Sequence, residues 1–387
     1  MSAPLRPGRK LLVMAVAALL GLVLALALAE GVLRLLPVAD QFLAENNIDA
    51  QNPLIRFKKS GAFTFSRGFG FDMVNRVRTN NDGFVNDQDY TTTDPRPLLA
   101  VVGDSYVEAA MVPYPQTLQG RLAQSVDGHG RVYSFGASGS QLPTYLAYAR
   151  YARDTYRPQG LVIVIVGNDF DESHIEFRNS PGLHYFEPGP GGELRMRLVE
   201  YRPAHPDALH AIASRLGLGR LALVRHWRNN WPSAAFQLHR LAAFFSGQNQ
   251  TSFVGQTASM ASPHRVELSK RCVDAFFRLL PEYAGLPPER IVLVVDGLRP
   301  ELYDPLALAA AQGSFVAVLR AYFMEQGQRR GFEIIDMQPV FMDLHKKDGR
   351  VFEFKADGHW SGGGHAAAAE EVEQSRMFRA VFAPPAP

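Results

Sequence analysis

The chain has 387 residues, of which 47% are hydrophobic, and its formal net charge is only +2. This length and composition suit one large globular core with additions and argue against a disordered chain. No cluster of Lys and Arg interleaved with aromatic residues occurs, so no nucleic-acid partner is expected. The single cysteine, Cys272, cannot form an internal disulfide, and its apolar helical surroundings predict a buried structural thiol.

The first predicted element is a long apolar helix near the N-terminus. Residues 11–29 carry no charge and would form roughly 28 Å of helix, close to the bilayer core of about 30 Å. Arg6, Arg9 and Lys10 precede this stretch, so the positive-inside tendency predicts a single-pass anchor in a bacterial inner membrane, with the following domain in the periplasm. The alternative is a signal peptide cleaved after Ala29, which would give a secreted protein. In both cases the chain is exported.

A connector with short strands is predicted at residues 37–97, between the anchor segment at residues 1–36 and the next domain. Its clearest local pattern is Asn81-Asp82-Gly83, which has the composition of a tight turn.

Apolar strands alternate with amphipathic helices from residue 98 onward. The predicted strands are residues 98–102, 132–135, 161–166, 291–295 and 332–335. The main predicted helices are residues 117–125, 145–156, 266–280, 315–326 and about 364–378. This alternation predicts an α/β fold, namely a flavodoxin-like three-layer α/β/α sandwich with a mainly parallel five-stranded sheet, in a domain of residues 98–380.

Glycine-rich or polar blocks directly follow the first three of these strands. They are Gly103-Asp104-Ser105, Gly136-Ala137-Ser138-Gly139 and Gly167-Asn168-Asp169. Because the carboxyl ends of parallel strands meet at one edge of a sheet, we expect the three blocks to lie together.

A fourth block near the C-terminus, Asp357-Gly358-His359, supplies the groups that a reactive serine needs. A serine hydroxyl is a poor nucleophile at neutral pH, so it requires a histidine as base and a carboxylate that orients the histidine. Ser105 is the candidate nucleophile, and a helix N-cap is its alternative interpretation.

Asp104 and His365 are further candidates in these blocks or close to them. Asp104 suits a role in bracing the turn better than a role as catalytic acid. His365 begins the last helix and is interpreted as a packing or capping residue, because a metal site of His359 and His365 lacks a third ligand.

Taken in order, the four blocks resemble the SGNH (GDSL-type) hydrolase superfamily. The resemblance extends from residue 98 to the C-terminal helix. It implies that Ser105 is the nucleophile, His359 its base and Asp357 the orienting carboxylate. It also implies an oxyanion hole formed by the N–H groups of Ser105 and Gly139 and by the side chain of Asn168, with no cofactor and no metal.

The chain departs from the family pattern at two places. The second block usually has Asn where this chain has Ser134, which would remove a supporting hydrogen bond. Many members place Asp three residues before His, whereas Asp357 and His359 are two apart and are followed by Trp360. This spacing resembles a membrane-anchored branch that contains polysaccharide O-acetyltransferases and carbohydrate esterases.

The alternation breaks at residues 171–263, which we interpret as an insertion. Its first part, residues 182–203, contains a Pro- and Gly-rich centre and predicts a hairpin or a flap. Its second part, residues 208–245, has helical spacing. Trp227 and Trp231 lie four residues apart there, which is more typical of packing than of the alternative, a sugar-binding surface.

These observations predict a serine esterase that hydrolyses short acyl esters, O-acetyl groups above all, on carbohydrate through an acyl-serine intermediate. One alternative is a periplasmic polysaccharide O-acetyltransferase with the same residues, which would add a membrane protein that supplies the acyl group as a partner. Another is a carbohydrate-binding or assembly protein without catalysis. The expected partners are thus an acylated carbohydrate or small ester, and the membrane through the N-terminal helix.

Overall fold

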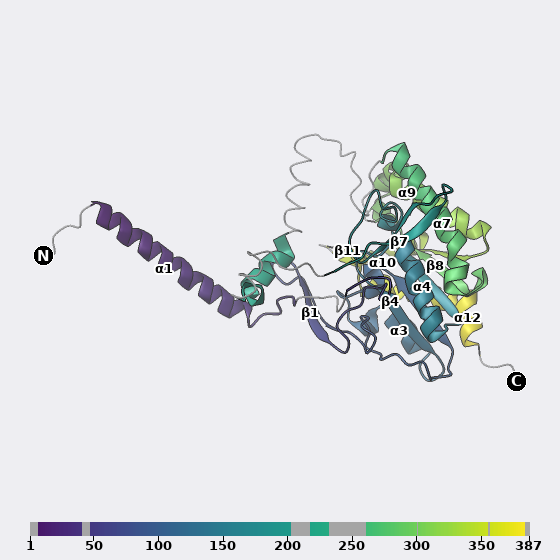
Figure 1. The fold of residues 1–387 in the computed structure, drawn as a ribbon, viewed down its shortest axis with the longest axis horizontal. Coiled ribbons are helices and arrows are strands. Elements are labelled where there is room, and N and C mark those ends of the chain that lie inside the picture. Colours follow the sequence, from purple (N-terminus) through teal and green to yellow (C-terminus); the bar gives the residue numbers. More distant parts are fainter. Residues whose placement is uncertain are drawn as a thin grey trace. The chain divides into compact units, whose positions relative to one another are not determined.

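A computed structural model describes residues 7–40, 47–202, 217–231, 261–299, 301–354 and 357–383 (Figure 1). The chain divides into two compact units. The anchor unit comprises Met1–Gln41, Phe63–Val74 and Ala204–Ala242. The sheet unit comprises Phe42–Ala62, Asn75–Pro203 and Ala243–Pro387.

The anchor unit contains α1 (Pro7–Leu33), the long apolar helix expected from the sequence. Its most apolar stretch has a mean hydropathy of 3.0, and none of that stretch is buried. The unit also contains a second helical segment at residues 222–231. A two-stranded sheet is formed by β1 (Ala62–Arg67) and β2 (Met73–Arg78).

The sheet unit is built on five parallel strands in the order β4-β3-β5-β8-β9. The strands are β3 (Leu98–Gly103), β4 (Arg131–Gly136), β5 (Gly160–Ile165), β8 (Ile291–Val295) and β9 (Glu333–Asp336). All residues of the first four are buried, and the Val, Ile and Leu runs of β3, β5 and β8 suit strands covered on both faces. The predicted five-stranded sheet and its strand positions are confirmed.

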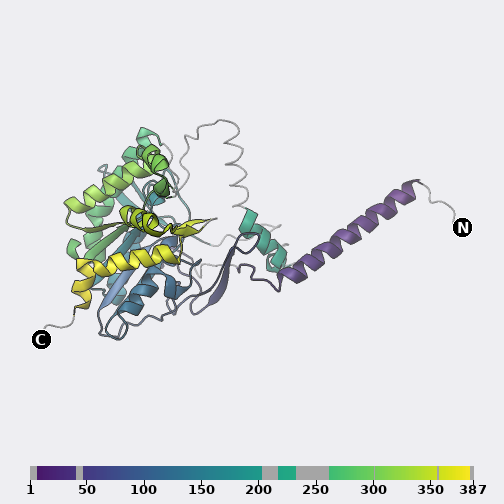
Figure 2. The same cartoon turned by 180° about the vertical axis from the view of Figure 1, so that it is seen from behind.

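Helices cover both faces of this sheet and make a three-layer α/β/α sandwich (Figures 1 and 2). One face carries α4 (Leu142–Tyr156), α7 (Pro263–Ala284) and α9 (Phe315–Arg329). The other carries α3 (Leu118–Ser125), α10 (Met337–Asp348), α11 (Gly362–Gln374) and α12 (Arg376–Phe382).

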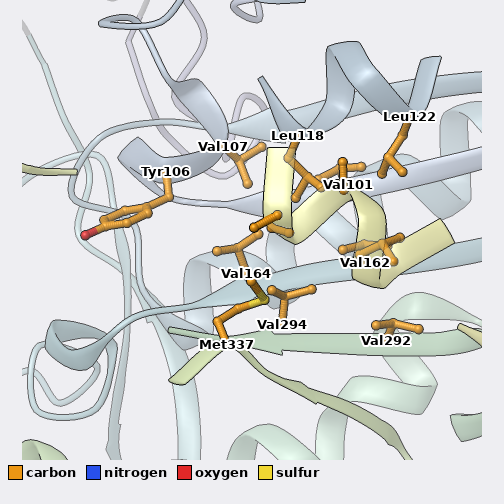
Figure 3. Packing of buried hydrophobic residues seen from close by; sticks show 14 of the residues in the cluster. Val101, Tyr106, Val107, Leu118, Leu122, Val162, Val164, Val292, Val294 and Met337 are labelled. Carbon is orange, nitrogen blue, oxygen red and sulfur yellow. The ribbon is translucent and has the colours of Figure 1, made fainter. Parts of the chain in front are cut away.

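Alternate residues of the central strands pack against the helical layer formed by α3, α10, α11 and α12. Val162 and Val164 of β5 point to the same face and meet Leu118 and Leu122 of α3 in one buried cluster (Figure 3). Burying a side chain of this kind contributes about 1.5–3 kcal/mol, so this cluster holds the sheet and the α3 layer together.

The remaining described elements are short. They are α2 (Ser105–Glu108), β6 (His184–Pro188), β7 (Leu194–Leu198), α8 (Pro305–Ala311), β10 (Glu353–Phe354) and β11 (Asp357–Trp360). The antiparallel pair β6 and β7 confirms the predicted hairpin. In the predicted turn of the connector, Gly83 has φ +85, and Oδ1 of Asn80 accepts the N–H groups of Asp82 and Phe84 at 3.0 Å each.

Two expectations are wrong. The helix expected at residues 364–378 is two helices, because Ser375 has an extended backbone and its hydroxyl accepts the N–H of Phe378, which starts α12. Trp227 and Trp231 are not packing residues, since 55% and 45% of their surfaces are exposed and their rings stack on each other. The rest of the helical stretch expected at residues 208–245 lies outside the described residues, except for residues 217–231.

Candidate active site

Ser105 lies in the tight turn between β3 and α2, at the carboxyl edge of the sheet. The turn needs glycine at Gly103, because a Cβ there would lie 2.5 Å from Cγ2 of Val107. Asp104 caps α2 by accepting the N–H of Tyr106 at 2.9 Å, which is the bracing position expected of it. Chain order along the sheet reverses at β3, so Ser105 lies at the switch point where parallel α/β sheets bind ligands.

His359 reaches Ser105 from β11. Its Nε2 lies 2.7 Å from the hydroxyl oxygen of Ser105. Its Nδ1 is hydrogen-bonded to a carboxylate oxygen of Asp357, which also accepts the backbone N–H of His359 at 3.0 Å. Because an ionised carboxylate only accepts, Nδ1 carries the proton and Nε2 presents its lone pair to the serine hydroxyl. The histidine is therefore oriented to take the serine proton.

The spacing of Asp357 and His359 explains how this pair forms. Both residues belong to β11, and residues i and i+2 of a strand project to the same side. The buried carboxylate of Asp357 therefore lies beside the imidazole.

A buried polar network that the sequence did not reveal is hydrogen-bonded to β11 on both sides of His359. The guanidinium of Arg299 donates to the carbonyl of Gly358 at 2.8 Å and to the hydroxyl oxygen of Tyr106 at 2.7 Å. It also donates from Nε to Asp296 at 3.0 Å, and the same carboxylate accepts the indole N–H of Trp360 at 2.9 Å. Tyr106 donates its own hydroxyl to the Gly358 carbonyl at 2.8 Å. The residues on both sides of His359 are thus fixed by one network.

One sequence signal could have pointed to this network. Asp296 directly follows β8, at the same edge of the sheet as the three blocks. Arg299 comes three residues later, but no local pattern shows that it turns toward Gly358 and not toward solvent.

The loop after β4 brings Ser138 and Gly139 against α2. The N–H of Ser138 donates to one carboxylate oxygen of Glu108 at 2.5 Å, and the Ser138 hydroxyl donates to the other at 3.0 Å. Gly139 has φ +83, a backbone conformation that favours glycine. This loop and the Ser105 turn begin side by side, because the last residues of the two neighbouring strands, Gly136 and Gly103, are paired.

Asn168 lies in the short turn that follows β5. Its side-chain amide donates to a carboxylate oxygen of Glu172 at 3.3 Å, and the same oxygen is paired with the guanidinium of Arg178. Arg178 also lies over Gly139, where a Cβ would be 2.7 Å from its Nη2. The negative charge of Glu172 beside the Asn168 amide is therefore offset by Arg178, a pair that sequence reasoning missed.

Buried carboxyl groups surround these loops. Burial raises the pKa of Asp104 to about 6, that of Glu108 to about 7 and that of Asp171 to about 7. Burial also raises the pKa of Asp169, which accepts the Tyr145 hydroxyl at 2.7 Å. The site thus keeps several protons on carboxyl groups at mildly acidic pH.

At Ser134, where the family pattern usually has Asn, another segment of the chain supplies an amide side chain. The side-chain amide of Asn86, in the predicted connector, donates to the Ser134 hydroxyl at 3.0 Å. Tyr90 donates its hydroxyl to the Ser134 carbonyl at 2.7 Å. An amide side chain is therefore supplied to this position from outside β4.

His365 and Cys272 are buried at positions that fit a structural role, as the sequence predicts. Nδ1 of the buried His365 accepts the backbone N–H of Leu118 at 3.1 Å, and burial lowers the pKa of His365 to about 3. Cys272 is buried in α7, and burial raises the pKa of its thiol. Within the described ranges, no group of three or more His, Cys, Asp or Glu residues is arranged to hold a metal ion.

Of the five predicted site residues, the structure brings Ser105, His359 and Asp357 into one hydrogen-bonded chain. Gly139 and Asn168 lie on the two neighbouring loops at the same edge and are linked through Arg178 and Glu172, as described above.

No protein-family model matches the chain, and no curated protein matches it. The chain is similar to several solved structures at low sequence identity. A member of the lipolytic protein G-D-S-L family from Veillonella parvula DSM 2008 is 9% identical, with 72% of this chain and 98% of that chain covered and a TM-score of 0.34. A carbohydrate acetylesterase family member from Sinorhizobium meliloti is 11% identical, with coverages of 74% and 100% and a TM-score of 0.33. A salicylyl-acyltransferase from a tetracycline biosynthetic pathway is 13% identical, with coverages of 80% and 66% and a TM-score of 0.35.

Proposed function

We propose that this protein is a serine esterase that acts on short acyl esters. The observation that carries the proposal is the 2.7 Å contact between the Ser105 hydroxyl and Nε2 of His359, whose Nδ1 is held by Asp357. A serine with an oriented base is the arrangement needed for nucleophilic acyl transfer.

The reaction proceeds in two steps. Oγ of Ser105 attacks the ester carbonyl carbon while Nε2 of His359 takes the hydroxyl proton, and the bond to the alcohol then breaks as His359 gives that proton to the departing oxygen. A water molecule next attacks the acyl-serine and gives a proton to His359. Collapse of this second intermediate releases the carboxylic acid and returns the proton to Ser105.

The negative charge on the carbonyl oxygen is stabilised by the N–H groups of Ser105 and Gly139 and by the Asn168 amide. This assignment follows the family resemblance and is supported by the placement of the three loops at one sheet edge. Loss of one such donor costs about 2.7–4 kcal/mol in the activation barrier.

The substrate we favour is an O-acetyl group on carbohydrate, and the chain would act outside the cytoplasm. The Asp357-Gly358-His359-Trp360 spacing supports this choice through its resemblance to carbohydrate esterases and polysaccharide O-acetyltransferases. Arg9 and Lys10 precede the apolar part of α1, which favours an inner-membrane anchor with the sheet unit in the periplasm. Transfer to a sugar hydroxyl in place of water is the second candidate function, favoured by the same spacing.

The direct test is labelling of the full-length protein with a fluorophosphonate, followed by intact-protein mass spectrometry. We expect a single adduct on the wild type and none on Ser105→Ala. The matched control is Ser125→Ala, a serine at the end of α3 whose hydroxyl donates to the Leu122 carbonyl, and it should label like the wild type. Labelling of Ser105→Ala to the wild-type extent would overturn the proposal.

A second assay separates hydrolysis from transfer. The protein is given an isotope-labelled acetyl donor together with an oligosaccharide acceptor, and the products are analysed by mass spectrometry. Release of labelled acetate alone supports the esterase. Labelled acetyl groups on the oligosaccharide, absent with Ser105→Ala, support the transferase.

A further inference from the structure

The helical segment at residues 222–231 exposes its apolar face. Its exposed positions are 224, 227, 228 and 231, which share one face of a helix. Three of them are Val224, Trp227 and Trp231, and the fourth is Arg228. A helix of a soluble domain normally turns such residues inward, so this face is suited to an apolar surrounding.

The two tryptophans form an exposed aromatic surface. Their rings stack with centroids 4.8 Å apart. Phe69, which is 48% exposed, lies beside Trp227 with ring centroids 6.2 Å apart. The segment is held beside these rings, because the buried Asn230 accepts the N–H of Gly68 at 2.7 Å. We call Phe69, Trp227 and Trp231 the aromatic surface.

This helical segment begins where the apolar part of α1 ends. The carboxylate of Glu30, the first charged residue after residues 11–29, accepts the N–H of Ala222 at 3.0 Å and that of Leu223 at 2.9 Å. Arg225 is tied to the same region through an ion pair of 2.7 Å with Asp40. Figure 1 shows the segment, in teal, starting beside the C-terminal end of α1 and running in a different direction. The aromatic surface is therefore held near the level at which α1 would leave a bilayer.

We propose that the aromatic surface lies in the interface of the membrane that α1 spans. Trp is enriched at the boundary between lipid headgroups and acyl chains, where an apolar ring and a polar N–H both find partners. The exposed Arg228 lies on the same face, and a guanidinium pairs well with phosphate, the group that lipid headgroups present. The proposal rests on the membrane anchor of the proposed function but not on the esterase activity.

Tryptophan fluorescence of the full-length protein in phosphatidylcholine and phosphatidylglycerol vesicles tests this contact. The chain has only three tryptophans, and Trp360 is fully buried in the sheet unit. Lipids brominated close to the headgroup end of the acyl chain quench tryptophans in the interface, and the same lipids without bromine give the reference. We expect loss of the emission of Trp227 and Trp231, and less quenching when the bromine is near the chain end. The remaining emission should equal that of Trp227→Phe/Trp231→Phe, in which bromine has no effect.

The outcomes test the membrane anchor and the membrane contact of the aromatic surface separately. Failure of the protein to float with the vesicles refutes the anchor. Flotation with equal emission in brominated and unbrominated lipid refutes the aromatic contact, and so does a fluorescence change caused only by an added oligosaccharide, which would assign the rings to carbohydrate. The emission of Trp360 in the double variant should equal the emission that remains in the wild type in brominated lipid, and this agreement verifies the fold of the variant. Hydrolysis of a soluble ester by that variant should match the wild type. The quenching by lipid is measured without any substrate, so it tests the membrane contact even if the protein has no esterase activity.

Discussion

Arg299 is the buried cation behind the strand that carries His359, and its replacement tests whether the reaction needs that strand held in place. Arg299→Met keeps an unbranched side chain of similar length but removes every hydrogen bond of the guanidinium. The Gly358 carbonyl then keeps only the hydroxyl of Tyr106 as the donor described above.

The structure sets the size of the two expected effects. Asp296 is only 6% exposed and is the closest carboxylate to Arg299. Breaking a buried ion pair by removing one partner costs about 3–5 kcal/mol in folding stability. A shift of about 1 Å in a catalytic group costs about 100-fold in rate. We therefore expect kcat to fall by about that factor while KM stays nearly unchanged, because Arg299 contacts β11 and not the substrate.

A double variant separates orientation from stability. Asp296→Asn combined with Arg299→Met removes the charge from both partners of the buried pair, and the new side-chain amide still offers an oxygen to the Trp360 indole. Removing both partners of a buried pair is often nearly neutral for stability, so the free energy of unfolding should recover the part of its loss that comes from Asp296, whereas Glu353, 3.4 Å from Arg299, still lacks its cation. The Gly358 carbonyl still lacks the guanidinium donor, so kcat should stay low. The matched control is Arg379→Met on the exposed side of α12.

The measurements are urea denaturation for the free energy of unfolding and steady-state hydrolysis of a soluble acetyl ester for kcat and KM. A wild-type kcat in Arg299→Met would refute the positioning role. Recovery of both kcat and stability in the double variant would show that the loss of activity came from instability alone.

Three further results are expected. Asp357→Asn should lower kcat by about 10⁴-fold in the ester assay, because the imidazole loses the carboxylate that holds its tautomer. Arg178→Ala should lower kcat by about 100-fold, because the Glu172 carboxylate is left without its cation beside Asn168, and adding Glu172→Gln should restore most of the loss. Burial raises the pKa of Glu108 from 4.5 to about 7, so its proton is bound more tightly in the folded state, and the free energy of unfolding should fall as pH rises through this window, by roughly 3 kcal/mol in total. Urea denaturation at several pH values should show a smaller slope in Glu108→Gln.

Each of these has a contradicting result. Activity of Asp357→Asn within a factor of a few of the wild type would mean that the base is oriented by other groups. If Arg178→Ala with Glu172→Gln stays as slow as Arg178→Ala, Arg178 acts directly and not through Glu172. An unchanged pH dependence of stability in Glu108→Gln would mean that Glu108 is ionised in the folded protein.

The sheet and the reactive serine could be predicted because their signals are local. A strand buried on both faces is typically a short apolar run, so β3, β5 and β8 were visible in the sequence as such runs. Ser105 and Asn168 directly follow two of those runs, and the chain order alone places both at the carboxyl edge. The pairing of Asp357 with His359 has a local part as well, since the two-residue repeat of a strand sends both side chains to the same side.

The other features depend on segments that are distant in the sequence. Arg299 and Gly358 meet only because the loop after β8 and the strand β11 pack against the same turn, and Asn86 reaches Ser134 from a segment that precedes β3 in the chain. The exposure of Trp227 depends on which segments pack against its helix, which the helical spacing cannot reveal. The sequence by itself determined the strands, the order of the blocks and the candidates for the reactive groups, because these follow from neighbouring residues. Tertiary structure alone decided what holds His359 in place and which aromatic residues face outward, because burial and hydrogen-bond partners depend on which distant segments meet.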